Sequence, residues 1–397
     1  MYDVKSLKAE EFICDEEIKA TLEYAEQNKS NAALIEEILE KARPKKTGRG
    51  VECSGLSHRE ASVLLACDIP EMTEKIYALA REIKEAFYGD RIVMFAPLYL
   101  SNYCVNKCVY CPYHQQNKEI PRKKLTQEEV RDEVIALQDM GHKRLAIEAG
   151  EDPVNNPIEY ILDCIKTIYS IKHKNGAIRR VNVNIAATTV ENYRKLKEAG
   201  IGTYILFQET YHKDSYETLH PAGPKHNYAY HTEAMDRAMD GGIDDVGLGV
   251  LFGLDLYKYE FAGLLMHAEH LEAVHGVGPH TISVPRVKRA SDIDPSVFDN
   301  NEYRLREEIV LDELEDGLPV VAFDRENFLE NPVLLELGFY NPAVFILVEE
   351  AQNIVDASVI PVRAHDEHIA DEAGEHHAPG KFIHRDQNEP VGVAGAE

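Results

Sequence analysis

The sequence has few basic residues for its size. It contains 397 residues, with 43 Lys and Arg against 69 Asp and Glu, which gives a formal net charge of −26. A surface of this sign repels phosphate backbones, so nucleic acid is excluded as an expected partner. The chain also lacks an apolar run approaching the roughly 18 residues of a membrane span, and no secretion signal follows Met1. We therefore expect a cytoplasmic protein that does not bind a membrane.

Cysteine is also scarce, and its distribution is uneven. The chain has seven cysteines, and three of them fall in one short segment. This distribution is typical of a ligand cluster in a reducing compartment and excludes a disulfide framework. The other four cysteines are scattered and indicate small structural residues, and none occurs after Cys164.

The spacing of apolar residues predicts three regions. Residues 1–90 show apolar positions at helical spacing and are expected to form a helical extension. From residue 91 to residue 350, strands alternate with helices, which predicts a parallel sheet closed into a TIM-like (βα) barrel. Residues 351–397 are rich in Ala, Gly, His and acidic residues and predict a disordered tail.

The barrel interpretation depends on the number of strands. The predicted strands are 92–98, 144–147, 181–185, 204–207, 246–251, 281–284, 320–323 and 344–348. An open, doubly wound sheet is the alternative. No Gly-x-Gly-x-x-Gly motif follows a predicted strand, which disfavours that alternative.

The densest chemical signal is a run of three cysteines directly after the first predicted strand. Cys104, Cys108 and Cys111 have the spacing C-x3-C-x2-C. Three thiolates on one loop can bind three irons of a four-iron, four-sulfur cluster, which leaves the fourth iron open to a small molecule. Tyr110 can cover that open iron and pack against an adenine. A zinc site with His114 as its fourth ligand is the alternative.

Polar residues lie near the carboxyl end of four later strands or directly after it, and this end of a barrel carries the active site. In chain order the candidates are Gly150 with Glu151, Asn184, Glu209 with Tyr211 and His212, and Ser283 with Arg286. Glu151 can accept hydrogen bonds from an ammonium, and Arg286 can bind a carboxylate with its planar fork. The acid, phenol and imidazole at residues 209–212 favour a catalytic role. A plain turn, a helix cap and a surface ion pair are the structural alternatives.

The cysteine loop resembles the signature of the radical S-adenosylmethionine (SAM) enzymes. The resemblance implies a [4Fe-4S] cluster whose open iron binds the amino and carboxylate groups of SAM. It also implies that the segment Gly150-Glu151 holds the methionine amino group. For Asn184 the reason is different: inward-facing amides are unusual in an apolar barrel, so we expect this side chain to contact the cofactor.

Residues 1 to about 300 resemble, more closely, the tyrosine lyase family of [FeFe]-hydrogenase maturation. The similar segments are residues 104–111, 147–153, 208–212, 219–225, 242–247 and 278–286. The family implies cleavage of the Cα–Cβ bond of L-tyrosine to p-cresol and dehydroglycine. Its expected partners are an electron donor, such as a ferredoxin or flavodoxin, and other hydrogenase maturation proteins.

The sequence departs from that family toward its end. The family converts dehydroglycine to carbon monoxide and cyanide on a second cluster, which is held by later cysteines. No cysteine follows Cys164 here, so the residues support the first half-reaction only. The alternatives are a thiamine-type tyrosine lyase (2-iminoacetate synthase), a non-catalytic iron–sulfur carrier or scaffold, and a defective enzyme with an open barrel.

Overall fold

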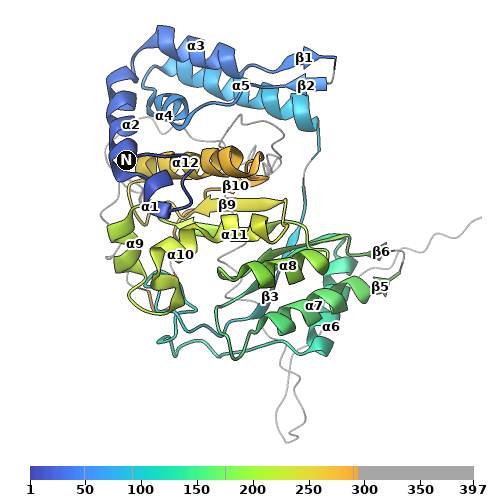
Figure 1. The fold of residues 1–397 in the computed structure, drawn as a ribbon. Coiled ribbons are helices and arrows are strands. Elements are labelled where there is room, and N and C mark those ends of the chain that lie inside the picture. The colour runs from blue at the N-terminus through green and yellow to red at the C-terminus, as the bar shows by residue number, and fades with distance from the viewer. Residues whose placement is uncertain (49, 92, 175, 289, 294–397) are drawn as a thin grey trace, which may run out of the picture. The chain divides into compact units, whose positions relative to one another are not determined.

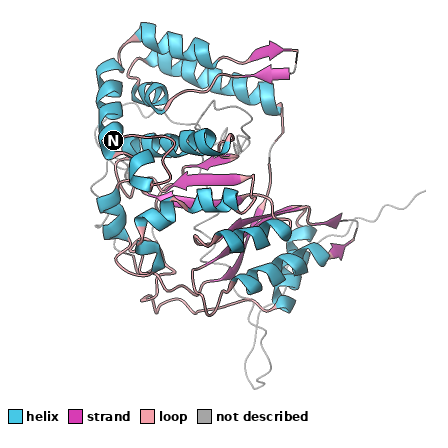
Figure 2. Ribbon diagram, viewed as in Figure 1, coloured by secondary structure: helices cyan, strands magenta, loops and turns pink. Residues whose placement is uncertain are grey.

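A parallel β-sheet forms the centre of the protein (Figures 1 and 2). The computed structural model describes residues 1–293 except 49, 92, 175 and 289. The predicted strands at 320–323 and 344–348 and the predicted tail at 351–397 lie outside these residues. The domain boundaries at residues 90 and 350 therefore stay predictions.

The sheet has six strands in the order β10-β9-β8-β7-β4-β3, and every neighbouring pair is parallel. The strands are β3 (Ala96–Ser101), β4 (Arg144–Ala149), β7 (Arg180–Asn184), β8 (Tyr204–Glu209), β9 (Val246–Val250) and β10 (Thr281–Ser283). This arrangement confirms the predicted parallel α/β architecture. The first strand was predicted too early in the chain, because pairing with β4 begins only at Ala96.

Helices connect the strands, as parallel neighbours require. They are α6 (Gln127–Asp139), α7 (Ile158–Ser170), α8 (Val190–Glu198), α9 (Lys213–Leu219), α10 (Tyr228–Thr232), α11 (Ala234–Asp240) and α12 (Tyr257–His275). A small hairpin of β5 (Lys172–His173) and β6 (Gly176–Ala177) follows α7. Among the described helices, none combines the length and the apolar character that a membrane span requires.

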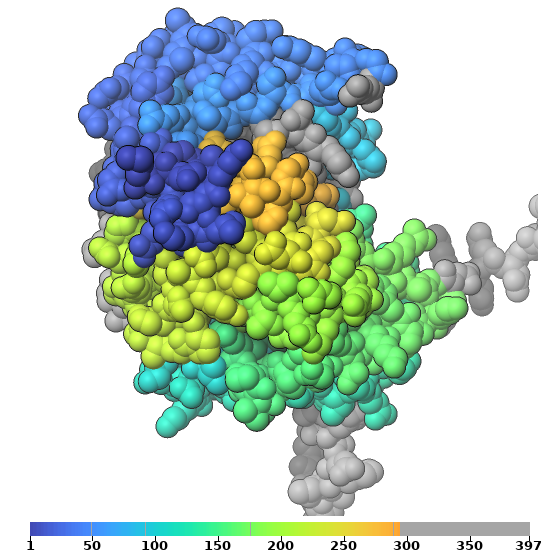
Figure 3. All heavy atoms as spheres, in the orientation of Figure 1, coloured from blue at the N-terminus to red at the C-terminus, as the bar shows by residue number. Residues whose placement is uncertain are grey.

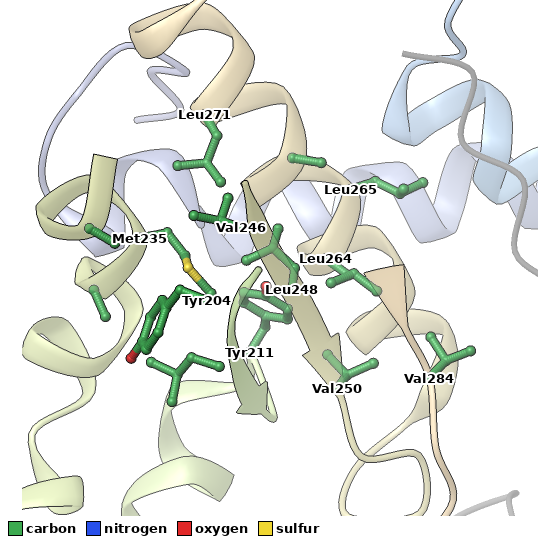
Figure 4. Packing of buried hydrophobic residues seen from close by; sticks show 14 of the residues in the cluster. Tyr204, Tyr211, Met235, Val246, Leu248, Val250, Leu264, Leu265, Leu271 and Val284 are labelled. Atoms are coloured by element: carbon green, nitrogen blue, oxygen red, sulfur yellow. The ribbon is translucent and has the colours of Figure 1, made fainter. Parts of the chain in front are cut away.

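The two faces of the sheet differ in burial. Val246, Leu248 and Val250 on β9 are at most 1% exposed, and Figure 4 shows them packing against Leu264 and Leu265 of α12. Along β8, buried residues alternate with half-buried ones. Since side chains alternate between faces of a strand, one face of the sheet is sealed by helices, and the other is lined by partly accessible side chains.

The N-terminal region is helical, as predicted, and also contains a hairpin that was not predicted. It comprises α1 (Ala9–Phe12), α2 (Asp15–Asn28), α3 (Ala32–Ala42), α4 (His58–Ala66) and α5 (Pro70–Tyr88), with β1 (Lys45–Thr47) and β2 (Gly50–Glu52) between α3 and α4. Ser57 and Glu60 form a capping box at the start of α4. Figure 3 shows the first residues of the chain against the segment that contains α12.

His58 links the N-terminal helical region to α12. Its Nδ1 lies 2.8 Å from Oε2 of Glu269, and its Nε2 lies 3.1 Å from Oε1 of Glu17. Burial alone would lower the pKa of His58, but the two carboxylates outweigh it, so the pKa is raised. The imidazolium therefore forms a buried ion pair with both glutamates.

We expect this ion pair to make stability depend on pH. An unfolded histidine titrates near about pH 6.5, and the folded pKa of His58 is higher. Its contribution is therefore fully present below the unfolded pKa and is lost as the pH rises through the folded pKa. Urea unfolding at several pH values between about 6 and 9 should show this loss in the wild type and not in His58→Gln. His173→Gln, on β5, is the control and should keep the pH dependence of the wild type. If the free energy of unfolding of His58→Gln changes with pH as steeply as that of the wild type, the assignment is contradicted.

Candidate active site

The cysteine loop begins directly after β3 and is held by backbone hydrogen bonds to two other segments of the chain. The amide of Val105 donates to the carbonyl oxygen of Glu151 (2.8 Å), just beyond β4. The amide of Lys107 donates to the carbonyl oxygen of Ala222 (3.0 Å), after α9, and that of Val109 to the carbonyl oxygen of Leu219 (3.1 Å), the last residue of α9. The loop is therefore tied to the carboxyl ends of two strand–helix units, where parallel-sheet enzymes place their active sites.

Arg122 closes the loop from its far end. Its guanidinium donates to four backbone carbonyl oxygens, those of Asn102 (2.6 Å), Tyr113 (2.9 Å), His114 (2.6 Å) and Asn117 (3.1 Å). A planar guanidinium carries five N–H donors in a fixed fork and can serve four acceptors, whereas an ammonium has only three donors. Sequence reasoning missed this residue, because a single Arg after a cysteine run has no distinguishing pattern.

The three thiols of the loop are free and close enough to influence one another. Cys108 is 5% exposed, and Cys104 and Cys111 are half-buried. Burial raises the pKa of Cys108 above its usual range and that of Cys111 to about 11, and the neighbouring thiols add to both shifts. The charge of Lys225 acts in the opposite direction on both. Ionised thiolates at this position thus need positive charge close by, from a lysine or from bound metal.

The zinc alternative finds no support in the geometry. Nε2 of His114 lies 3.2 Å from Oδ2 and 3.0 Å from the carbonyl oxygen of Asp292. Within residues 1–293 as described, no three His, Cys, Asp or Glu side chains converge on a single-ion position. A four-iron cluster instead distributes its cysteine ligands over different irons, which a loop of three thiols suits.

Gly150 and Glu151 lie against the cysteine loop. A side chain at Gly150 would overlap the carbonyl oxygen of Tyr103, so only glycine permits this close approach. Oε2 of Glu151 accepts a hydrogen bond from Nδ2 of Asn106 (2.6 Å). Burial raises the pKa of Glu151, with Asn106 and Lys225 opposing the shift. A carboxylate held here could accept hydrogen bonds from an ammonium group.

Lys225 and Glu209 form an ion pair beside the loop. Nζ of Lys225 lies 2.7 Å from Oε1 of Glu209, and the two side chains are 17% and 14% exposed. Burial alone would lower the pKa of Lys225, but Glu209 raises it above its usual value, so Nζ stays charged. Nζ also lies 6.0 Å from the ring centroid of Tyr110. Glu209 has a φ of 70°, a conformation that side-chain-bearing residues rarely adopt and that often marks a functional position.

Tyr110 is held by a hydrogen-bond relay. Its hydroxyl lies 2.7 Å from Nε2 of His220, and Nδ1 of His220 lies 2.7 Å from the carbonyl oxygen of Tyr216. Burial, followed by the charge of Lys225, lowers the pKa of His220 to about 2. The imidazole is therefore neutral, its Nδ1–H donates to Tyr216, and Nε2 accepts from Tyr110.

Asn184, Ser283 and Arg286 lie along the carboxyl ends of other strands. Asn184 ends β7 and pairs with Glu148 of β4. Ser283 ends β10, and Arg286 follows it, half-buried and in a parallel bridge with Phe252. Their placement agrees with predicted positions at the end of the sheet, while their roles stay predictions.

The structure does not bring Tyr211 and His212 to the cysteine loop. Tyr211 is 1% exposed, its hydroxyl lies 2.9 Å from Nδ1 of His267, and Figure 4 shows it within the apolar core. Nδ1 of His212 lies 3.1 Å from Oδ2 of Asp255 and 2.8 Å from Oγ of Ser215. The proximity of these two residues to Glu209 in the sequence was therefore misleading, because the chain turns away after the strand.

Comparisons with known proteins agree with this geometry. The family model of the Radical SAM superfamily matches residues 98–265. A crystal structure of HydG, a maturase of the [FeFe]-hydrogenase, is 58% identical, with a TM-score of 0.68, over 75% of this chain and 62% of that one. HydG from Carboxydothermus hydrogenoformans is 40% identical, with a TM-score of 0.64, over 75% and 65%.

A relative with a different name is also similar. The 2-iminoacetate synthase of Salmonella typhimurium is 28% identical over 257 residues, which are 64% of this chain and 66% of that protein. The chain thus spans just under two thirds of the length of these relatives.

Proposed function

Since residues 98–265 form a radical SAM domain, we propose that this enzyme cleaves the Cα–Cβ bond of L-tyrosine to p-cresol and dehydroglycine. The observation that carries the proposal is the convergence of the cysteine loop, Glu151 and the Lys225–Glu209 pair at one end of the sheet. The resemblance of residues 104–111, 147–153 and 278–286 to the tyrosine lyases supports tyrosine as the substrate, and the 58% identity to a HydG maturase supports hydrogenase maturation as the setting.

The residues present fit the [4Fe-4S] cluster and the SAM molecule that the superfamily implies. Cys104, Cys108 and Cys111 would bind three irons of a [4Fe-4S] cluster, and SAM would bind at the fourth. When bound, this pair supplies a carbon-centred radical that starts the reaction. Glu151 would accept from the SAM ammonium, and Lys225 offers a buried cation for its carboxylate.

The other residues that were predicted to contact the cofactor lie near the proposed site of the cluster and SAM. Gly150 allows the close approach of the chain, Tyr110 is fixed by His220 beside the loop, and Asn184 ends a neighbouring strand. We assign Glu209 to binding at this site, with Lys225 as its partner. A ferredoxin or flavodoxin would supply the electron.

The proposal is tested by anaerobic reconstitution with iron, sulfide, SAM, L-tyrosine and a reductant. We expect 5′-deoxyadenosine and p-cresol in comparable amounts, because one radical abstraction leads to one cleavage. A reaction without tyrosine measures uncoupled cleavage of SAM. Formation of 5′-deoxyadenosine without p-cresol, at saturating tyrosine, would reject the proposed substrate.

The second product is expected to leave unchanged. No cysteine follows Cys164, so the residues after it offer no cysteine ligands for a second cluster. Dehydroglycine is chemically the same compound as 2-iminoacetate, and in water it hydrolyses to glyoxylate. We therefore propose that the chain by itself releases glyoxylate rather than carbon monoxide and cyanide. Cyanide formed in proportion to p-cresol would contradict this assignment.

Arg286 is the proposed anchor of the tyrosine carboxylate. Lysine keeps the charge but lacks the planar fork, so Arg286→Lys should still weaken the use of tyrosine. A lost charge-assisted hydrogen bond costs ~1.5–3 kcal/mol, so kcat/KM should fall about tenfold or more. Arg194→Lys, at an exposed position on α8, is the control. Unchanged kinetics in both Arg286→Lys and Arg286→Ala would refute the role.

A further inference from the structure

One row of side chains crosses the accessible face of the sheet at the level of Glu148. The register pairs Glu148 with Tyr99 on one side and with Asn184 on the other, and Asn184 pairs in turn with Ile205. All four side chains are half-buried, whereas Ile147, on the opposite face of β4, is fully buried. The row therefore lines the inner face of the sheet.

Glu148 is the exceptional member of this row. Within the described part of the chain, its carboxyl group has no hydrogen bond or ion pair. Removal from bulk water raises its pKa to about 8 and is the only cause of that shift. Most carboxyl groups in such surroundings are satisfied by a partner, because an unsatisfied polar group is costly. A partner supplied by a ligand would remove this cost.

The neighbouring strands present an apolar wall. Ile205 and Phe207 lie on the same face of β8. A side chain at Gly249 would overlap the ring of Phe207, so the glycine lets this ring lie across β9. A wall of aliphatic and aromatic surface beside an unsatisfied carboxyl group suits an aromatic ring that carries one polar substituent.

We propose that Glu148 recognises the phenol hydroxyl of L-tyrosine and is a specificity-determining residue for this substrate. The inference rests on the proposed function. The register supports the orientation: the row that contains Glu148 meets β9 at Gly247, whereas Arg286 bridges to Phe252, beyond the carboxyl end of β9. A tyrosine whose carboxylate binds Arg286 at the rim would thus direct its ring inward, between Glu148 and Phe207.

The test compares the binding of L-tyrosine and L-phenylalanine, which differ only in the hydroxyl. Equilibrium dialysis on the reconstituted holoprotein gives the dissociation constant of each, independently of turnover. We expect Glu148→Leu to raise the constant for tyrosine roughly ten- to a hundredfold and to leave that for phenylalanine unchanged or lower. Glu148→Gln, which keeps an acceptor, should lie between Glu148→Leu and the wild type.

Glu159→Leu, at an exposed position on α7, is the matched control. Iron content and the visible spectrum of the cluster report whether each variant is intact. The assignment is overturned, while the lyase proposal stands, if Glu148→Leu binds tyrosine and phenylalanine more weakly by the same factor. It is also overturned if this variant still prefers tyrosine to phenylalanine as strongly as the wild type does. A wild-type holoprotein that forms p-cresol but does not bind tyrosine in preference to phenylalanine also overturns it. A wild type that forms no p-cresol from tyrosine overturns the proposed function and this assignment together.

Discussion

Replacing Cys104, Cys108 and Cys111 together by alanine is expected to remove all cluster iron and all activity. A single four-iron cluster corresponds to about four irons per chain after reconstitution. The three thiols are the only cysteines of this chain within one short loop, and the other four are scattered along the sequence. No cysteine therefore remains at the site to retain the cluster when these three are lost. Iron and sulfide assays, with EPR of the reduced protein, measure the outcome.

The control for this experiment is a cysteine away from the loop. Cys67 is the C-cap residue of α4, and its Sγ lies 3.7 Å from the carbonyl oxygen of Ile69. Cys67→Ala should keep the full iron content and the full yield of p-cresol. Substantial iron in the triple variant would show a second cluster elsewhere in the chain and would contradict the single-cluster prediction.

Removing the charge of Lys225 is expected to have the largest effect on stability. Lys225→Met leaves Glu209 as an uncompensated carboxylate in a largely buried position. Loss of one partner of a buried pair typically costs ~3–5 kcal/mol of the free energy of unfolding. Lys197→Met, which breaks the exposed pair with Asp244, should cost only ~0–1 kcal/mol. Urea unfolding of the two variants provides the comparison.

A double variant separates stability from function. In Lys225→Met/Glu209→Gln no buried charge remains unpaired, so most of the lost stability should return. Activity should not return, because the proposed cation beside the cluster is still missing. If the Lys225→Met variant unfolds with no lower free energy than the Lys197→Met variant, the buried ion pair is contradicted. Recovery of p-cresol formation by the double variant would contradict a role for Lys225 at the site.

Local patterns in the sequence were sufficient for most of the described fold. The capping boxes at Ser57 and Thr126 depend on residues only three positions apart, and each starts a helix. The strand–helix alternation gave the parallel sheet, since each parallel neighbour needs a long connection. The hairpin of β1 and β2 was missed, because its strands are three residues each and mostly exposed.

The site was predictable where its residues are adjacent in the chain. The cysteine loop and the segment Gly150-Glu151 met as expected. Lys225 and Arg122 were assigned no role, because their partners are not their neighbours in the sequence. Lys225 pairs with Glu209 at the end of β8, and Arg122 donates to four backbone carbonyl oxygens. Tyr211 was assigned a catalytic role, yet its hydroxyl binds His267, 56 residues later in the chain. Such pairings depend on tertiary packing and leave no local signal.

The bonds of Arg122 bear on the order of assembly. In small zinc domains the metal supplies the free energy of folding, so the binding loop is unstructured until metal arrives. Here four carbonyl oxygens of the cysteine segment are fixed by a guanidinium from the same chain, without any contribution from sulfur. Delivery of iron is then a docking step onto a preformed loop rather than a folding step. A chain that has lost its cluster to oxygen would keep the shape needed to receive another.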